Sequence, residues 1–147
     1  MSADLDALVR KAVYDSFLTR GRTILRAEVA AQLGIDSAEV AESFRRLAEA
    51  HMLALQSNGE VLMAFPFSAV ATPFKVRAGA QEWWANCIWD ALGVAAMIRG
   101  KAVIESFCPD CGEALALAVT SAGPRASEAV AHFAVPAAHW WDDIVFT

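Results

Sequence analysis

Residues 82–98 read EWWANCIWDALGVAAMI, and this is the most apolar stretch of the chain. Apolar residues at helical spacing predict one helix over the whole stretch, ended by Gly100. Cys87 and Asp90 stand three residues apart in it, so on a helix they share one face, with their Cβ atoms about 5–6 Å apart. We therefore expect this helix to be the centre of the fold and to carry the chemistry.

The composition excludes several classes of protein. Of the 147 residues, 56% are hydrophobic and only 20% are charged, which excludes a disordered chain. The net charge of −5 disfavours nucleic-acid binding, because phosphates need a basic face. No apolar run reaches the roughly 20 residues of a membrane span. The acidic N-terminus lacks the features of a signal peptide. We therefore expect a cytoplasmic protein that binds neither nucleic acid nor membrane.

Residues 1–65 are predicted to form a winged-helix-like N-terminal domain. The pattern predicts helices over 4–19, 26–33 and 36–50, followed by strands over 52–56 and 60–65 that flank the turn dipeptide Asn58-Gly59. Asp36 and Glu39 have the spacing of a capping box. The third helix carries four acidic and two basic residues, a balance that phosphate would repel. The unit is therefore predicted to pack against other parts of the chain and not to read DNA.

Residues 66–147 are predicted to form a second domain built on a sheet. Pro66 and Pro73 exclude a regular helix between them. The alternation predicts strands over 72–77, 101–107, 114–120 and 130–135, and a further element from Trp140. The fold class expected is α+β, with a mixed or antiparallel sheet and one apolar active-site helix.

Cys87 and Asp90 are the candidate reactive pair. Cys87 falls near the start of the predicted helix, where the helix dipole favours thiolate. Asp90 has apolar neighbours, which raise the pKa of a carboxyl group and let it hold a proton for delivery. A thiolate beside a carboxylic acid is a nucleophile with a proton donor. The alternative is a buried structural cysteine beside a surface aspartate.

The other candidates are a CxxC motif and a cluster of tryptophans. Cys108 and Cys111 resemble half of a zinc site, but structural zinc needs four ligands, which Cys87, His132 and His139 could complete only by folding close. A weak metal site, a redox pair and a tight turn with incidental thiols all remain open. The tryptophans Trp83, Trp84 and Trp89 either pack in the core or line a pocket for an apolar ligand.

The segment Asn86–Ile98, NCIWDALGVAAMI, resembles the active-site helix of the alkylmercury lyase family. The preceding FPFSAVATPFKV (65–76) is similar to the segment before that helix in relatives, and residues 101–113 resemble the hairpin that follows it. The resemblance implies a winged-helix-like first domain that does not read DNA. It also implies an enzyme of mercury detoxification that protonolyses carbon–mercury bonds, releasing Hg(II) and a hydrocarbon.

The resemblance also implies residue roles. Cys87 corresponds to the first catalytic cysteine, which binds mercury, and Asp90 to the aspartate that relays the proton. Cys108 corresponds to a structural cysteine, and Cys111 has no counterpart. No cofactor is implied: mercury is the substrate metal, free thiols are the expected cosubstrate, and Hg(II) would be handed to a mercury-reducing enzyme.

The end of the sequence departs from the family pattern. In relatives, the segment resembling 141–147 runs into the second catalytic cysteine and further elements, so we expect the chain to be C-terminally incomplete. A UGA codon for selenocysteine, a fragment and a degenerate paralogue are the three explanations, and the DNA past codon 147 distinguishes them. The chain as given is expected to bind mercury at Cys87 and to turn over slowly.

Two other classes of function remain beside the lyase. One is a non-catalytic mercury-binding or metal-binding, thiol-based regulatory protein on a winged-helix scaffold, with Cys87, Cys108 and Cys111 as ligands. The other is a thiol-dependent enzyme that acts on a different substrate with the same fold. Neither the organic group accepted nor the oligomeric state follows from these residues.

Overall fold

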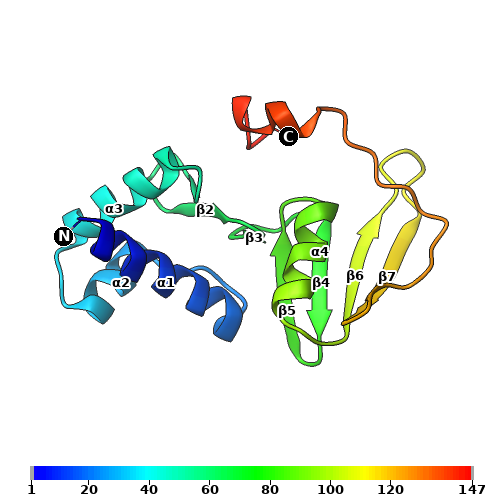
Figure 1. Cartoon of the computed structure of the whole chain (residues 1–147), viewed down its shortest axis with the longest axis horizontal. Coiled ribbons are helices and arrows are strands. Elements are labelled where there is room, and N and C mark those ends of the chain that lie inside the picture. Colours follow the sequence, from blue (N-terminus) through cyan, green and yellow to red (C-terminus); the bar gives the residue numbers. More distant parts are fainter. Residues whose placement is uncertain (1, 147) are drawn as a thin grey trace.

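The molecule, a computed structural model that describes residues 2–146, is built on one eight-stranded antiparallel sheet in the order β1-β2-β3-β5-β4-β6-β7-β8. Three helices gather at the β1–β2 end of the sheet, and α4 packs against its centre (Figure 1). This arrangement confirms the α+β class. Every strand pair is antiparallel, which decides between the mixed and antiparallel alternatives.

The N-terminal helices lie where the periodicity predicts them. They are α1 (Ser2–Arg20), α2 (Arg26–Leu33) and α3 (Ser37–Glu49). Gly34 ends α2 in the left-handed conformation, at φ 68°. At the start of α3 the Glu39 carboxylate accepts the backbone N–H of Asp36 at 3.2 Å, so one of the unpaired helix-terminal N–H groups finds an acceptor.

The strands are short except in the last hairpin. They are β1 (Ala54–Leu55), β2 (Val61–Ala64), β3 (Phe67–Ser68), β4 (Phe74–Ala78), β5 (Gln81–Ala85), β6 (Ala102–Phe107), β7 (Ala114–Thr120) and β8 (Gly123–Pro124). The hairpin predicted around Asn58-Gly59 forms between β1 and β2, with Gly59 at φ 82°. The segment between the two prolines contributes β3, which the sequence analysis did not predict.

The prediction of a single helix over 82–98 is wrong in its first part. Gln81–Ala85 is strand β5, and α4 covers only Ile88–Met97. Trp83 and Ala85 alternate with exposed residues and point into the core, which is the period of a strand. The Trp83 indole N–H also donates to the Phe17 carbonyl at 2.7 Å. Pairing with β4 and this buried hydrogen bond outweigh the local helical pattern.

The predicted strand over 130–135 is also wrong. These residues are irregular, and Val130 is 87% exposed. The outer edge of β7 is paired with the short β8 instead. Phe133 packs against Trp140, with ring centroids 5.3 Å apart, so its apolar contact is with the C-terminal segment. The element expected from Trp140 is a 3-10 helix, η1, over Ala137–Asp142.

The helical unit and the sheet share one hydrophobic core. Phe17 of α1 stacks on Phe67 of β3 with ring centroids 4.9 Å apart, and both side chains are fully buried with residues of α4 in one cluster. The sheet also runs from β2 into β3 across residues 65 and 66. Among the described residues, no helix combines the length and apolar character needed to cross a membrane.

Gly21 provides a test of how closely α1 must approach β5. A Cβ atom on Gly21 would lie 2.6 Å from the Glu82 carbonyl oxygen, whereas one on Gly34 would meet nothing within 4 Å, and both residues have a left-handed φ near 70°. We expect Gly34→Ala to lower the free energy of unfolding by about 1–2 kcal/mol, the cost of the backbone conformation alone. Gly21→Ala should lower it further, as measured by urea denaturation. Equal losses would contradict the close approach.

Candidate active site

Cys87 is the N-cap residue of α4. Its backbone is extended, with φ −151°, and its Sγ accepts the backbone N–H of Asp90 at 3.4 Å. The helix begins here because the strand β5 ends at Ala85 and a thiol can accept the first unpaired N–H group of the helix. The sulfur of Cys87 is thereby held against the first turn that carries Asp90.

Asn86 holds the carboxyl group of Asp90. Its Nδ2 donates to Asp90 Oδ2 at 2.9 Å and lies 3.4 Å from each of the carbonyl oxygens of Pro66 and Phe67. The two carbonyl oxygens accept only N–H donors, so it is the NH₂ group of the amide that faces them and Asp90. Within residues 2–146, the buried Asn86 Oδ1 has no hydrogen-bond partner. The amide is therefore anchored on one side only.

Burial controls the protonation of both reactive groups. It raises the pKa of the Cys87 thiol, and the nearby Asp90 charge raises it further, while the N–H groups of Asp90 and Trp89 lower it. Burial likewise raises the pKa of Asp90, against the hydrogen bond from Asn86, which lowers it. The helix terminus does favour thiolate here, as expected, but desolvation outweighs it. Both groups are thus biased toward holding their protons.

A cavity of about 420 Å³ opens beside the pair. Its wall includes aromatic and aliphatic side chains from three parts of the chain; the lining residues are His51, Met63, Phe65, Asn86, Cys87, Trp89, Asp90, Phe133, Trp140, Trp141, Ile144, Val145 and Phe146. Trp141 stacks on His51 with ring centroids 4.1 Å apart and meets the edge of Phe65 at 5.2 Å. The C-terminal segment thereby contacts His51, which follows α3, and its side chains form one side of the cavity.

The three tryptophans predicted as pocket residues are placed differently from one another. Trp89 lines the cavity and is 64% exposed. Trp83 and Trp84 do not line the cavity. Trp83 is buried in the core, and the centre of the Trp84 ring lies 4.9 Å from the Lys75 ammonium. The other aromatic side chains of the cavity wall come from Phe65 and from the C-terminal segment. The density of aromatic residues there was a visible signal, but only the fold brings them to Cys87.

The CxxC motif lies away from this cavity, in the turn between β6 and β7. All three cysteines are free. Hydrogen bonds from the backbone N–H groups of Cys111 and Asp110 and from the Cys111 thiol lower the pKa of Cys108. In the part of the chain that the structure describes, no three His, Cys, Asp or Glu side chains are grouped to hold a metal ion.

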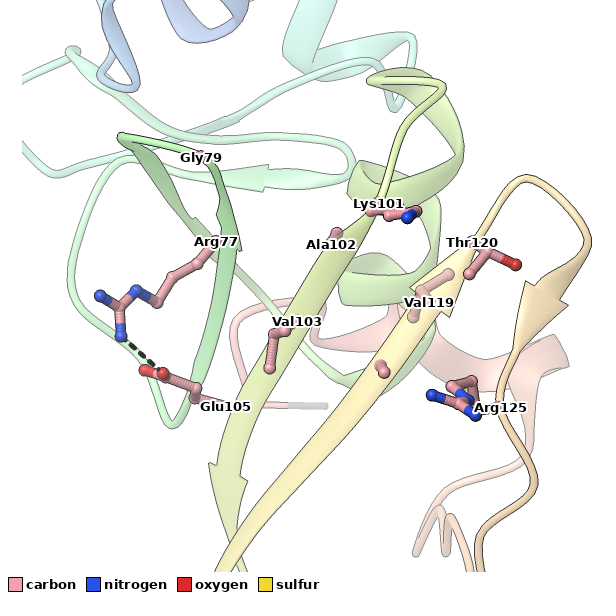
Figure 2. A pocket seen from close by; sticks show the side chains of 10 residues that line it. Arg77, Gly79, Lys101, Ala102, Val103, Glu105, Val119, Thr120 and Arg125 are labelled. Carbon is pink, nitrogen blue, oxygen red and sulfur yellow. Dashed lines mark hydrogen bonds and ion pairs between the residues drawn. The ribbon is translucent and has the colours of Figure 1, made fainter.

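A second cavity, of about 560 Å³, lies over β4, β6 and β7. Figure 2 shows the Arg77 guanidinium reaching Glu105, with Lys101 and Arg125 at other points of the rim; the Arg77–Glu105 distance is 2.8 Å. None of its lining residues is a cysteine or histidine. Of these two cavities, only the first is lined by a cysteine.

The raised pKa of Cys87 can be checked by alkylation. We expect the rate of Cys87 reaction with iodoacetamide, measured by peptide mass spectrometry, to rise at a higher pH than for a free cysteine, because burial disfavours thiolate. In Asp90→Asn the rise should move to lower pH, since the carboxylate charge is removed. A profile that does not respond to Asp90→Asn would contradict the electrostatic coupling. A short unstructured peptide with one cysteine serves as the reference.

The role of Asn86 can be checked by titration of Asp90. Asn86→Leu removes the hydrogen bond that lowers the pKa of Asp90, so the pKa of Asp90 should rise further, as followed by carboxyl infrared difference spectra. Asn86→Asp has a similar size and adds a carboxylate, which should raise the pKa of Asp90 by charge repulsion. No movement in either variant would show that the amide does not control Asp90.

Comparisons with known proteins identify a family and a similar fold. The family model for alkylmercury lyase (MerB) matches residues 67–147, which is more than half of the chain. A solved structure described as the mercury-bound form of MerB2 superposes with a TM-score of 0.63 at 18% sequence identity, covering 84% of this chain and 59% of that chain. The chain thus corresponds to about three fifths of that structure's length. No curated protein gives a significant match.

Proposed function

Because the chain belongs to the alkylmercury lyase family, we propose that it acts on organomercurials by protonolysis of the carbon–mercury bond, with Cys87 as nucleophile and Asp90 as proton donor. One observation carries the proposal: the Cys87 sulfur accepts the backbone N–H of Asp90 at 3.4 Å. Burial, which raises the pKa of the Asp90 carboxyl group, supports its role as proton donor. A soft metal ligand and a proton thus lie within one helical turn.

The first step is capture of the substrate. An organomercurial R–Hg–X exchanges X for the Cys87 sulfur, so that one Hg–S bond forms, the Hg–X bond breaks and the thiol proton leaves with X. Mercury is a soft metal and prefers sulfur. This preference compensates for the raised pKa of Cys87, because the metal displaces the proton. Cys87 need not be a thiolate before substrate arrives.

The second step is cleavage. The carbon of R takes the Asp90 proton as the C–Hg bond breaks, which gives the hydrocarbon R–H and leaves the mercury on Cys87. A free carbanion is too basic to leave unprotonated, so the proton must be in place beforehand. The carboxylate formed on Asp90 accepts the Asn86 amide hydrogen bond, which stabilises the product state.

A free thiol completes the cycle. It gives its proton to the Asp90 carboxylate and its sulfur to mercury, which restores the acid and leaves mercury between two sulfurs. Exchange with a second thiol releases the Hg(II) dithiolate and returns the Cys87 thiol. The reaction uses no cofactor, since the metal enters as part of the substrate.

The cavity wall indicates how the organic group is held. Phe65 and Trp141 meet edge to face beside the pair, and Trp89 lies on the same wall. The aromatic part of the wall binds apolar groups through buried area, an interaction that does not depend on the direction in which the group lies. We propose that small alkyl and aryl groups bind there with little discrimination.

The catalytic roles can be separated by two substitutions. Cys87→Ser should lose the phenylmercury bound at position 87, as located by peptide mass spectrometry, and should lose release of benzene with it. Asp90→Asn should still bind one phenylmercury per chain at Cys87, but benzene release should fall by a factor of about 10²–10⁴, because the proton donor is gone. Gas chromatography of the headspace measures benzene.

Asp15→Asn is the matched control, because it makes the same change at an exposed position of α1. Undiminished benzene release from Cys87→Ser would overturn the proposal. Stoichiometric phenylmercury binding with no release from the unsubstituted chain would support instead the non-catalytic mercury-binding reading.

A further inference from the structure

The turn that joins β6 to β7 brings two thiols together outside the candidate active site. Its backbone is closed by two hydrogen bonds, from Gly112 N–H to the Cys108 carbonyl and from Cys108 N–H to the Glu113 carbonyl, both 2.8 Å. Gly112 has φ +75°, a conformation that glycine adopts without strain. The turn is therefore a defined structure that fixes both cysteines at its two ends.

The same turn keeps the two thiols close together. The hydrogen bond from Gly112 N–H to the Cys108 carbonyl brings the two ends of the segment 108–112 together, so Cys111 lies beside Cys108. In agreement with this closeness, groups of Cys111 and Asp110 lower the pKa of Cys108. Cys111 is exposed and Cys108 is partly exposed, so a small ion can reach both sulfurs from solvent.

We propose that Cys108 and Cys111 form a second metal site, separate from Cys87, that binds one two-coordinate soft cation, and that this cation is the Hg(II) produced at Cys87. The donor number decides the class of ion. Zinc takes four ligands in structural sites, and the turn supplies two. Mercury(II) is satisfied by two sulfurs, and thiolates select soft metals. The identity of the cation as the product rests on the proposed function.

The register of the sheet places this pair at the same end of the sheet as Cys87. Lys75 of β4 pairs with Trp84 of β5 on one side and with Glu105 of β6 on the other. Both β5 and β6 run antiparallel to β4 and so end at the same end of the sheet, where Cys87 and Cys108 follow (Figure 1). Two strand spacings separate β5 from β6, about 10 Å.

Because both sites lie at one end of the sheet, free thiols would carry Hg(II) only a short distance from Cys87 to the turn. Hg(II) leaving Cys87 as a dithiolate of two free thiols exchanges onto the turn: two Hg–S bonds break, two form, and the two protons of Cys108 and Cys111 move to the departing thiols. No electron is transferred. The two cysteines hold mercury more tightly than two separate thiols do, because the second bond forms within one molecule.

The test uses Hg(II) alone and the full chain in a Cys87→Ser background, where only Cys108 and Cys111 remain as thiols. The protein is reduced and titrated with HgCl₂ in excess 2-mercaptoethanol, and Hg–S charge-transfer absorbance and native mass spectrometry report binding. We expect one Hg(II) per chain. Adding Cys111→Ser should weaken binding at least about tenfold, since the chelate is lost. Cys108→Ser should do the same.

Circular dichroism shows whether each variant is folded. If Cys108→Ser unfolds the hairpin, the Cys111→Ser variant still tests the inference, because Cys111 is exposed. Equal Hg(II) affinity with and without Cys111 would overturn the inference. So would a reduced protein that binds no Hg(II) while 2-mercaptoethanol is present. The readout needs no carbon–mercury cleavage. If benzene is released but the turn binds no Hg(II), only this inference fails. If the turn binds Hg(II) but no benzene is released, only the proposed lyase activity fails.

Discussion

The buried hydrogen bond from the Trp83 indole to the Phe17 carbonyl is the contact on which the rest of the molecule depends. It joins the C-terminal part of α1 to the middle of β5 inside the shared core, where an unpaired indole N–H would cost free energy. With β5 fixed in this way, the chain leaves the sheet at Ala85 and α4 begins at Cys87. The Cys87 sulfur therefore owes its position to a contact made by a helix of the N-terminal unit.

The candidate active site balances two opposing electrostatic effects. The helix terminus supplies N–H groups that favour charge on Cys87, and burial disfavours charge on both Cys87 and Asp90. Burial is the stronger effect, so the pKa of each group lies above its ordinary value. Cys108 differs from Cys87, because the hydrogen-bonding groups of Cys111 and Asp110 lower its pKa by more than burial raises it. One chain thus carries two kinds of cysteine that differ in their surroundings.

The apolar excess of the chain divides between core and surface. Most of the buried hydrophobic residues form one cluster that spans the helices and the sheet. Others remain exposed on the last hairpin and in the C-terminal segment, among them Val103, Phe107 and Phe146. The aromatic residues of that segment close the cavity beside Cys87, so part of the excess serves the candidate site and not the core.

The sequence by itself determined the elements whose signals are local. The helices α2 and α3, the hairpin at Asn58-Gly59 and the strands β6 and β7 follow from caps, turn residues and alternation that act over a few residues. The proximity of Cys87 and Asp90 could also be predicted, because residues three apart at the start of a helix lie on one turn. Only the tertiary structure decided that residues 81–85 are a strand, since Trp83 finds its partner 66 residues away in the chain. It also decided which aromatic residues surround Cys87, because contacts between distant segments leave no periodic pattern in the sequence.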